Sequence, residues 1–232
     1  MARKGKNPHY FLKRELALWG ISTAVILTAF CLFDRENFLT LAASLLGASS
    51  LIFVAKGNPI GQILMIIFSL LYGIISYSFG YYGEMLTYLG MTAPMAVVSL
   101  VSWLRNPYNG IRAQVKVNRL SRAELCFTVV PAALVTAVFY FILRSFGTAN
   151  LVPSTVSVTT SFIAVYLTFR RSPFYALAYA ANDIVLILLW AMASAADRSY
   201  ISVVICFVIF LVNDIYGFVS WRKMSVRQSG GG

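Results

Sequence analysis

Eight apolar runs, most of them close to 20 residues long, restrict what this chain can fold into. A helix needs about 20 apolar residues to cross the ~30 Å hydrocarbon layer of a bilayer. Because that layer holds no water to satisfy unpaired backbone groups, such runs cross it as helices. The runs predict transmembrane helices at approximately 16–33, 38–56, 59–82, 86–104, 123–144, 151–169, 174–196 and 200–221.

The composition also indicates a multi-pass membrane protein. The 232 residues are 59% hydrophobic and 12% charged, whereas soluble domains are about 25% charged. The first run has a basic flank but no small-residue cleavage site, so we expect a transmembrane helix there. The three cysteines lie in apolar runs without metal-ligand spacing, and we expect them to act as buried hydrophobic side chains.

Lysine and arginine are distributed unevenly between the two sides of the predicted membrane. Of the 19 basic residues, 16 fall on the side of the N-terminus, which leaves Arg35, Arg144 and Arg198 on the other side. Because cytoplasmic loops retain basic residues, both termini are predicted to be cytoplasmic. This bias explains the net charge of +11 without a nucleic-acid partner. The basic N-terminal segment is interpreted as a contact with anionic lipid of the bilayer.

The sequence contains a weak internal repeat. An offset of 114 residues pairs Pro59 with Pro173, and an offset of 118 pairs the VSW tripeptides at 101–103 and 219–221. Two blocks of three helices, joined by one connecting helix, then have the same orientation in the membrane. This is the parallel-repeat arrangement of SWEET-type transporters, in which substrates bind near mid-membrane where the repeats meet.

The predicted fold is therefore an all-α membrane protein with eight transmembrane helices in a 3+1+3 arrangement plus one additional N-terminal helix. Its parts are 1–37, a basic tail and the additional helix; 38–106, the first repeat; 107–150, a basic cytoplasmic loop and the connecting helix; 151–224, the second repeat; and 225–232, a C-terminal tail.

Two Asn-Asp pairs interrupt the last two apolar runs, Asn182-Asp183 and Asn213-Asp214. Each asparagine lies nine residues from the inner end of its run, which at ~1.5 Å per residue places both pairs near the midplane. An aspartate at the bilayer centre costs about 2.5–3.5 kcal/mol on insertion scales. A polar cavity that binds a solute accounts for this cost. The alternative is that the asparagines only hydrogen-bond neighbouring helices.

Aromatic side chains recur at helical spacing along the faces that carry these pairs. Aromatic rings stack on a flat ring, while amides and carboxylates bind ring amides and sugar hydroxyls. No glycine-rich cradle and no deep arginine is present in the runs, so we expect an unphosphorylated solute. With two secondary candidates from the third run, the predicted solute contacts are Asn182, Asp183, Asn213, Asp214, Tyr175, Tyr179, Trp190, Tyr216, Gln62 and Ser69.

Other polar and aromatic residues receive structural interpretations. Trp19, Trp103 and Trp221 fall near the inner ends of their runs, and an aromatic belt at the membrane interface explains them. The hydroxyl-rich start of the sixth run ranks below the other solute contacts, because small polar residues more often serve close helix packing.

The segments AANDIVLILLW and NDIYGFVSW, the latter followed by Arg222-Lys223, resemble the PnuC family of vitamin-precursor transporters over about residues 38–224. Members of that family take up nicotinamide riboside, and relatives take up thiamine, riboflavin or deoxynucleosides. The resemblance implies facilitated diffusion of nicotinamide riboside by rocking of the two repeats, with phosphorylation in the cytoplasm trapping the solute. It also implies a homotrimer in the plasma membrane.

One departure from the family pattern leaves the solute open. Nicotinamide riboside transporters of this family commonly carry two tryptophans a turn apart before the asparagine of this run. The matching positions here are Tyr175 and Ala178, with Tyr179 nearby. A deoxynucleoside would suit these smaller stacking surfaces, and thiamine also remains an alternative.

Two other function classes compete with this interpretation. Paired aspartates could share a proton in an intramembrane protease, but neither belongs to a GxGD segment, and the single histidine, His9, lies in the basic tail. We therefore expect no enzymatic activity and no cofactor. A proton-coupled carrier, with Asp183 or Asp214 as the titrating group, is the other alternative.

Overall fold

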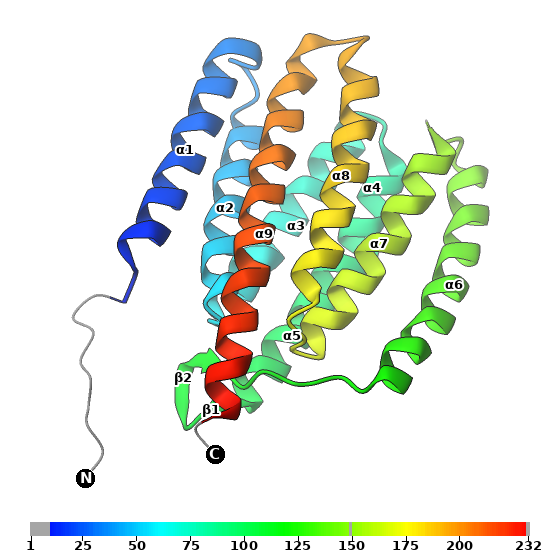
Figure 1. Ribbon diagram of the computed structural model, residues 1–232. Helices are drawn as coiled ribbons and strands as arrows, with labels where there is room; N and C mark the ends of the chain where they lie inside the picture. The colour runs from blue at the N-terminus through cyan, green and yellow to red at the C-terminus, as the bar shows by residue number, and fades with distance from the viewer. Residues whose placement is uncertain (1–9, 149, 231–232) are drawn as a thin grey trace.

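The computed structural model describes residues 10–148 and 150–230, which form a bundle of long helices (Figure 1). Within that part of the chain, eight spans are long and apolar enough to cross a membrane, which confirms the predicted number. A short antiparallel hairpin, β1 (Pro107–Tyr108) and β2 (Ile111–Val115), is the exception to the expected all-α fold. The α-helices are α1 (Lys13–Phe33), α2 (Phe38–Ala55), α3 (Ile60–Ser78), α4 (Tyr82–Thr87), α5 (Ala93–Arg105), α6 (Arg122–Ser145), α7 (Leu151–Phe169), α8 (Tyr175–Ser194) and α9 (Ile201–Ser229).

Helices α4 and α5 make one span, Tyr82–Arg105, with a π-helical turn between them. Pro94 has no N–H for the usual helical bond, and the N–H of Ala93 donates to the carbonyl of Tyr88, five residues earlier. Such widened turns are frequent at functional sites. The predicted start of this span at residue 86 is wrong, because the apolar pattern begins inside a helix that also includes Glu84.

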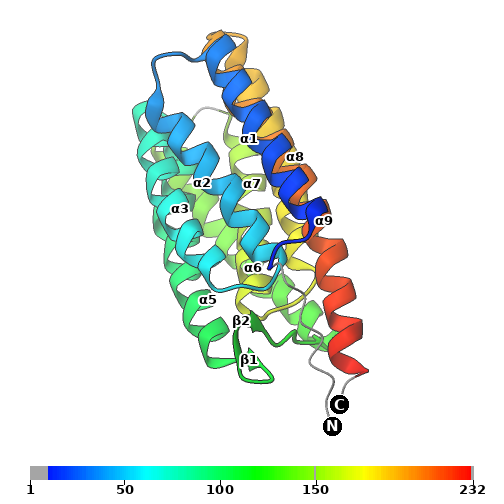
Figure 2. The ribbon, with the colours of Figure 1, turned by 90° about the vertical axis from the view of Figure 1, so that its left-hand side faces the viewer.

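Helices α1 and α6 stand on opposite flanks of the bundle in Figure 1, with the other helices between them, and Figure 2 shows α1 from its outer side. Helix α6 exposes large apolar side chains along its length, among them Phe127, Val130 and Phe141. Lipid tails are as apolar as these side chains, so this exposure suits a helix at the rim of a membrane protein.

Two tryptophans cross-link the bundle near the end that carries the hairpin. The Nε1–H of Trp103 in α5 donates to the carbonyl of Thr168 in α7 at 3.0 Å, and that of Trp221 in α9 donates to Val54 in α2 at 2.8 Å. Their ring centroids are 5.4 Å apart. Both rings are buried, so the aromatic-belt interpretation is wrong for them, although Trp19 is exposed. The last carbonyls of a helix have no partner within it, and each indole supplies one.

The loops that follow α2 and α7 match each other in detail. Gly57 and Arg171 have positive φ angles of 68° and 56° and lie 114 residues apart. The N–H of Gly57 donates to Val54 at 2.8 Å, and the N–H of Arg171 donates to Thr168 at 3.0 Å. Thus each carbonyl that accepts the indole N–H of a tryptophan also accepts a backbone N–H from the residue two positions beyond the end of its helix.

An extended segment, residues 115–118, runs across this end of the bundle, and we call it the strap. Its four successive backbone N–H groups each donate to a different element. The N–H groups of residues 115 and 116 donate to the carbonyls of Gly57 at 2.9 Å and Asn106 at 2.8 Å. Those of residues 117 and 118 donate to Oε1 of Gln228 at 2.8 Å and the carbonyl of Arg171 at 3.0 Å. The strap therefore ties both matched loops to the ends of α5 and α9.

Candidate functional site

Three buried acidic residues inside the spans form no ion pair with a described residue: Glu84, Asp183 and Asp214. The two ion pairs within the described residues use Glu15 and Glu124 instead. A buried carboxylate is strongly unfavourable unless it is protonated, hydrogen-bonded or paired with a cation. These three groups are therefore the side chains in the bundle that most need a partner.

Asp183 of α8 and Asp214 of α9 face each other, and Tyr179 lies near both. Oδ2 of Asp183 has no hydrogen-bond partner among the described residues. Two adjacent carboxylates in a region of low dielectric constant do not both stay ionised without compensation. The pair therefore suits either a shared proton or a cationic ligand.

Asn182, next to Asp183, is held by the neighbouring helix. Its Oδ1 accepts hydrogen bonds from three hydroxyls of α7, those of Ser157, Thr160 and Ser161, at 3.4, 2.8 and 3.0 Å. This is the interhelical contact that the sequence left open as an alternative. The same contact fixes α8 against α7 and so orients Asp183.

Two of the predicted contacts lie elsewhere. Asn213 donates through Nδ2 to the hydroxyl of Ser22 in α1 at 3.0 Å, and the hydroxyl of Tyr216 lies 3.2 Å from Oε1 of Glu15 in α1. Successive helical residues point about 100° apart, so α9 directs Asp214 toward α8 and Asn213 toward α1. The structure does not bring Asn213 and Tyr216 together with the two aspartates.

The predicted aromatic contacts divide between the two ends of the bundle. Trp190 donates to the hydroxyl of Tyr72 at 2.6 Å and packs on Tyr81, with ring centroids 4.7 Å apart. These rings lie toward the end opposite the strap. Tyr175 packs edge-on against Trp221, with centroids 5.0 Å apart, at the end that carries the strap. Tyr179 is therefore the predicted aromatic residue placed near both aspartates, while Tyr175 lies within electrostatic reach of Asp214.

The two secondary candidates both lie in α3. Gln62 is buried in its first turn, and Ser69 is fully buried two turns further along. The hydroxyl of Ser69 has no hydrogen-bond partner among the described residues. An offset of 114 residues matches Ser69 with Asp183.

Glu84 is the functional candidate that the sequence analysis missed. Its side chain is fully buried, Oε2 lies 3.5 Å from the hydroxyl of Ser157, and Oε1 has no partner among the described residues. Tyr88 lies within electrostatic reach of both Glu84 and Asp183. The placement of the span at 86–104 left Glu84 in a loop, although the acidic residue in YYGEML directly before an apolar run was the available signal.

We define the central cluster as the polar group that α4, the π-helical turn after it, α8 and α9 contribute around these carboxylates. Its members are Glu84, Tyr88, Tyr179, Asn182, Asp183 and Asp214. Ser157 of α7 lies between its two sides, because its hydroxyl is 3.5 Å from Oε2 of Glu84 and 3.4 Å from Oδ1 of Asn182 and can donate to either one. Within the described residues, no group of three or more His, Cys, Asp and Glu side chains could hold a metal ion.

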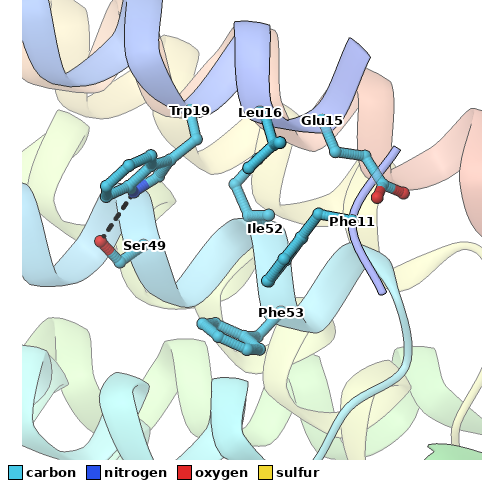
Figure 3. Close-up of a pocket in the computed structure, with 7 residues that line it drawn as sticks. All are labelled: Phe11, Glu15, Leu16, Trp19, Ser49, Ile52 and Phe53. Carbon is cyan, nitrogen blue, oxygen red and sulfur yellow. Dashed lines mark hydrogen bonds between the residues drawn. The ribbon is translucent and has the colours of Figure 1, made fainter. Parts of the chain in front are cut away.

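An open crevice lies apart from this cluster, between α1 and α2 (Figure 3). Its volume is about 180 Å³, below the roughly 300–1,000 Å³ of typical ligand pockets. Trp19 donates to the hydroxyl of Ser49 at 3.1 Å on one side of it (Figure 3). The crevice is lined by Phe11, Glu15, Leu16, Trp19, Ser49, Ile52 and Phe53. Its small volume and mainly apolar walls do not suit a solute with many hydroxyls.

Comparison with known proteins places the chain in a family. The sequence pattern of the nicotinamide mononucleotide transporter family matches residues 37–223. The chain belongs to this family. Two relatives are named nicotinamide riboside transporter PnuC. The one from Neisseria mucosa is 28% identical, over 94% of this chain and 88% of the relative. The one from Haemophilus influenzae is 21% identical, over 84% and 83%.

The fold also has a counterpart among solved structures. A crystal structure of the vitamin B3 transporter PnuC superposes with a TM-score of 0.84 and 24% sequence identity, over 94% of both chains. The protein is thus a multi-pass membrane protein of a transporter family with eight transmembrane helices, as the sequence predicts.

Proposed function

We propose that this protein takes up nicotinamide riboside. The observation that carries the proposal is the central cluster, because its aspartate pair has no cationic partner among the described residues. Nicotinamide riboside has a permanent positive charge on its pyridinium ring, so the ring compensates Asp183 and Asp214 when it binds. Tyr179 and Tyr88 supply aromatic faces beside these carboxylates for the flat ring.

The family name refers to nicotinamide mononucleotide, whereas the names of the two relatives refer to nicotinamide riboside, which lacks the phosphate group of the mononucleotide. Within the described residues, every lysine and arginine lies outside the spans or within roughly two turns of the end of a span, and the central cluster is acidic. A phosphate placed among these carboxylates would be repelled, and no lysine or arginine of the described residues forms an ion pair with them. The riboside therefore fits this site better than the mononucleotide.

The transport mechanism that we propose is facilitated diffusion followed by phosphorylation of the solute in the cytoplasm. Residues 38–106 and 151–224 are proposed as parallel repeats that rock about the central cluster. Two observations support this symmetry. Trp103 and Trp221 each donate a hydrogen bond to a helix end of the other repeat, and the loops after α2 and α7 match each other.

The orientation and assembly are proposed on the same basis. The end that carries the strap is rich in basic residues, which supports cytoplasmic termini in the plasma membrane. The exposed apolar surface of α6 is the surface we assign to contacts in a homotrimer within the bilayer.

The test is calorimetric binding of solutes to the purified protein and to its Asp183→Asn and Asp214→Asn variants. Charge-assisted interactions contribute about 1.5–3 kcal/mol, so each variant should bind nicotinamide riboside roughly 10- to 100-fold more weakly. Asp197→Asn, in an exposed loop between α8 and α9, is the matched control and should bind normally.

Other outcomes select the alternatives. Tighter binding of a deoxynucleoside or of thiamine would make that compound the solute. Normal binding by both aspartate variants would contradict the central cluster as the solute site. Uptake into proteoliposomes that requires a pH gradient would replace facilitated diffusion by a proton-coupled carrier.

A further inference from the structure

We propose that Glu84 determines specificity for a ribose over a deoxyribose, by accepting hydrogen bonds from the solute's sugar hydroxyls. This inference rests on the proposed function and extends it. It assigns a role to a residue outside the predicted contacts. It also addresses whether the solute carries a ribose or a deoxyribose, which the tyrosines at 175 and 179 left open.

The first observation is the unsatisfied hydrogen-bonding capacity of Glu84. Its side chain is fully buried, yet among the described residues Oε1 has no partner and Oε2 has only the distant hydroxyl of Ser157 at 3.5 Å. Buried polar groups in proteins are nearly always hydrogen-bonded, and an unpaired buried carboxylate oxygen is especially unfavourable. A ligand that donates hydrogen bonds is therefore the missing partner.

The second observation is the position of Glu84 relative to the aspartates. Ser157 contacts both Glu84 and Asn182, and Asn182 precedes Asp183 in α8. Tyr88 is within electrostatic reach of Glu84 and Asp183. Glu84 thus lies on the α4 and α7 side of the central cluster, while Asp183 and Asp214 lie on the α8 and α9 side. A ring that occupies the aspartate side leaves the attached sugar for Glu84.

The third argument is chemical. A carboxylate is purely an acceptor with two oxygens, and a ribose offers two neighbouring hydroxyl donors. Acidic side chains bind ribose hydroxyls in this way in dinucleotide-binding folds. A buried acceptor also rejects an analogue that lacks the hydroxyl, because the acceptor is then left unpaired. A thiamine or a deoxynucleoside would leave one or both oxygens of Glu84 without a donor.

The experiment compares nicotinamide riboside with its 2′-deoxy analogue by calorimetry on the wild-type protein and on Glu84→Gln, which keeps the size of the side chain. Wild type should prefer the riboside. The variant should bind the riboside roughly 10- to 100-fold more weakly than wild type does, and its affinity for the deoxy analogue should fall clearly less. The ratio of the two affinities should therefore decrease at least about 5-fold. Glu36→Gln, an exposed carboxylate beyond α1, is the control and should keep the preference.

Each other outcome contradicts the assignment. Equal losses for both compounds would mean that Glu84 pairs with the charged ring or only maintains the fold, and an unchanged preference would mean that it does not contact the sugar. Ser157→Ala provides a second test, because it removes the one hydroxyl that the described residues place near Oε2, and it should alter the preference for the riboside in a folded protein. Wild type that binds neither compound would overturn the proposed function itself, before Glu84 is considered.

Discussion

Trp103 and Trp221 show how single side chains hold the two halves of the bundle together. Each indole N–H reaches the carbonyl at the end of a helix in the other half, and the two rings pack on each other. Neither bond is visible as a pattern in the sequence, because a tryptophan near the end of an apolar run has the same appearance in an interfacial belt. Burial in the structure separates the two interpretations.

Replacing either tryptophan by phenylalanine should destabilise the protein by a similar amount. Trp103→Phe and Trp221→Phe each remove one buried hydrogen bond, which costs about 1–3 kcal/mol. Trp19→Phe is the control, since the Trp19 ring is exposed and its bond to Ser49 lies at the surface. Thermal unfolding in detergent measures the difference. A decrease in the unfolding temperature for Trp19→Phe as large as for the other two variants would contradict this explanation.

At the scale of elements, the apolar pattern predicts helices better than it predicts which of their faces meet. The bounds 151–169 of α7 agree with the sequence analysis, because the run from Leu151 to Phe169 has no charged residue and two arginines follow it. The start of α4 does not agree, because Glu84 and its neighbouring glycine and tyrosines resemble a loop. Helical periodicity separates the directions of Asn213 and Asp214, but it does not say that the first faces α1 and the second α8.

The strap gives an element-scale prediction. Gln228 accepts from the N–H of Val117 and donates to the carbonyl of Val115. In Gln228→Ala both bonds are lost, so the strap should open more often and its backbone amides should exchange faster. Hydrogen–deuterium exchange of peptides that cover residues 115–118 measures this. Arg227→Ala, an exposed neighbour on α9, is the control, and equal acceleration in both variants would contradict the role of Gln228.

For the whole molecule, the sequence was sufficient for the number of spans and for the family, because both depend on features repeated along the chain. The site was predicted in part. Asn182, Asp183, Asp214 and Tyr179 belong to the central cluster, while Trp190, Asn213 and Tyr216 lie in other contacts. The contacts to α1 could not be foreseen, since the repeat pattern on which the site prediction rested does not include that helix.

Within the described residues, no basic side chain forms an ion pair with Glu84, Asp183 or Asp214, and this has an electrical consequence. A cationic solute that crosses by facilitated diffusion carries one net charge inward. A membrane potential then contributes about 2.3 kcal/mol per 100 mV to its accumulation, which is roughly 50-fold. Uptake into proteoliposomes should therefore rise with an inside-negative potassium diffusion potential and fall when the potential is reversed. A proton that left the aspartate pair in exchange would cancel the charge, and uptake would then be indifferent to voltage.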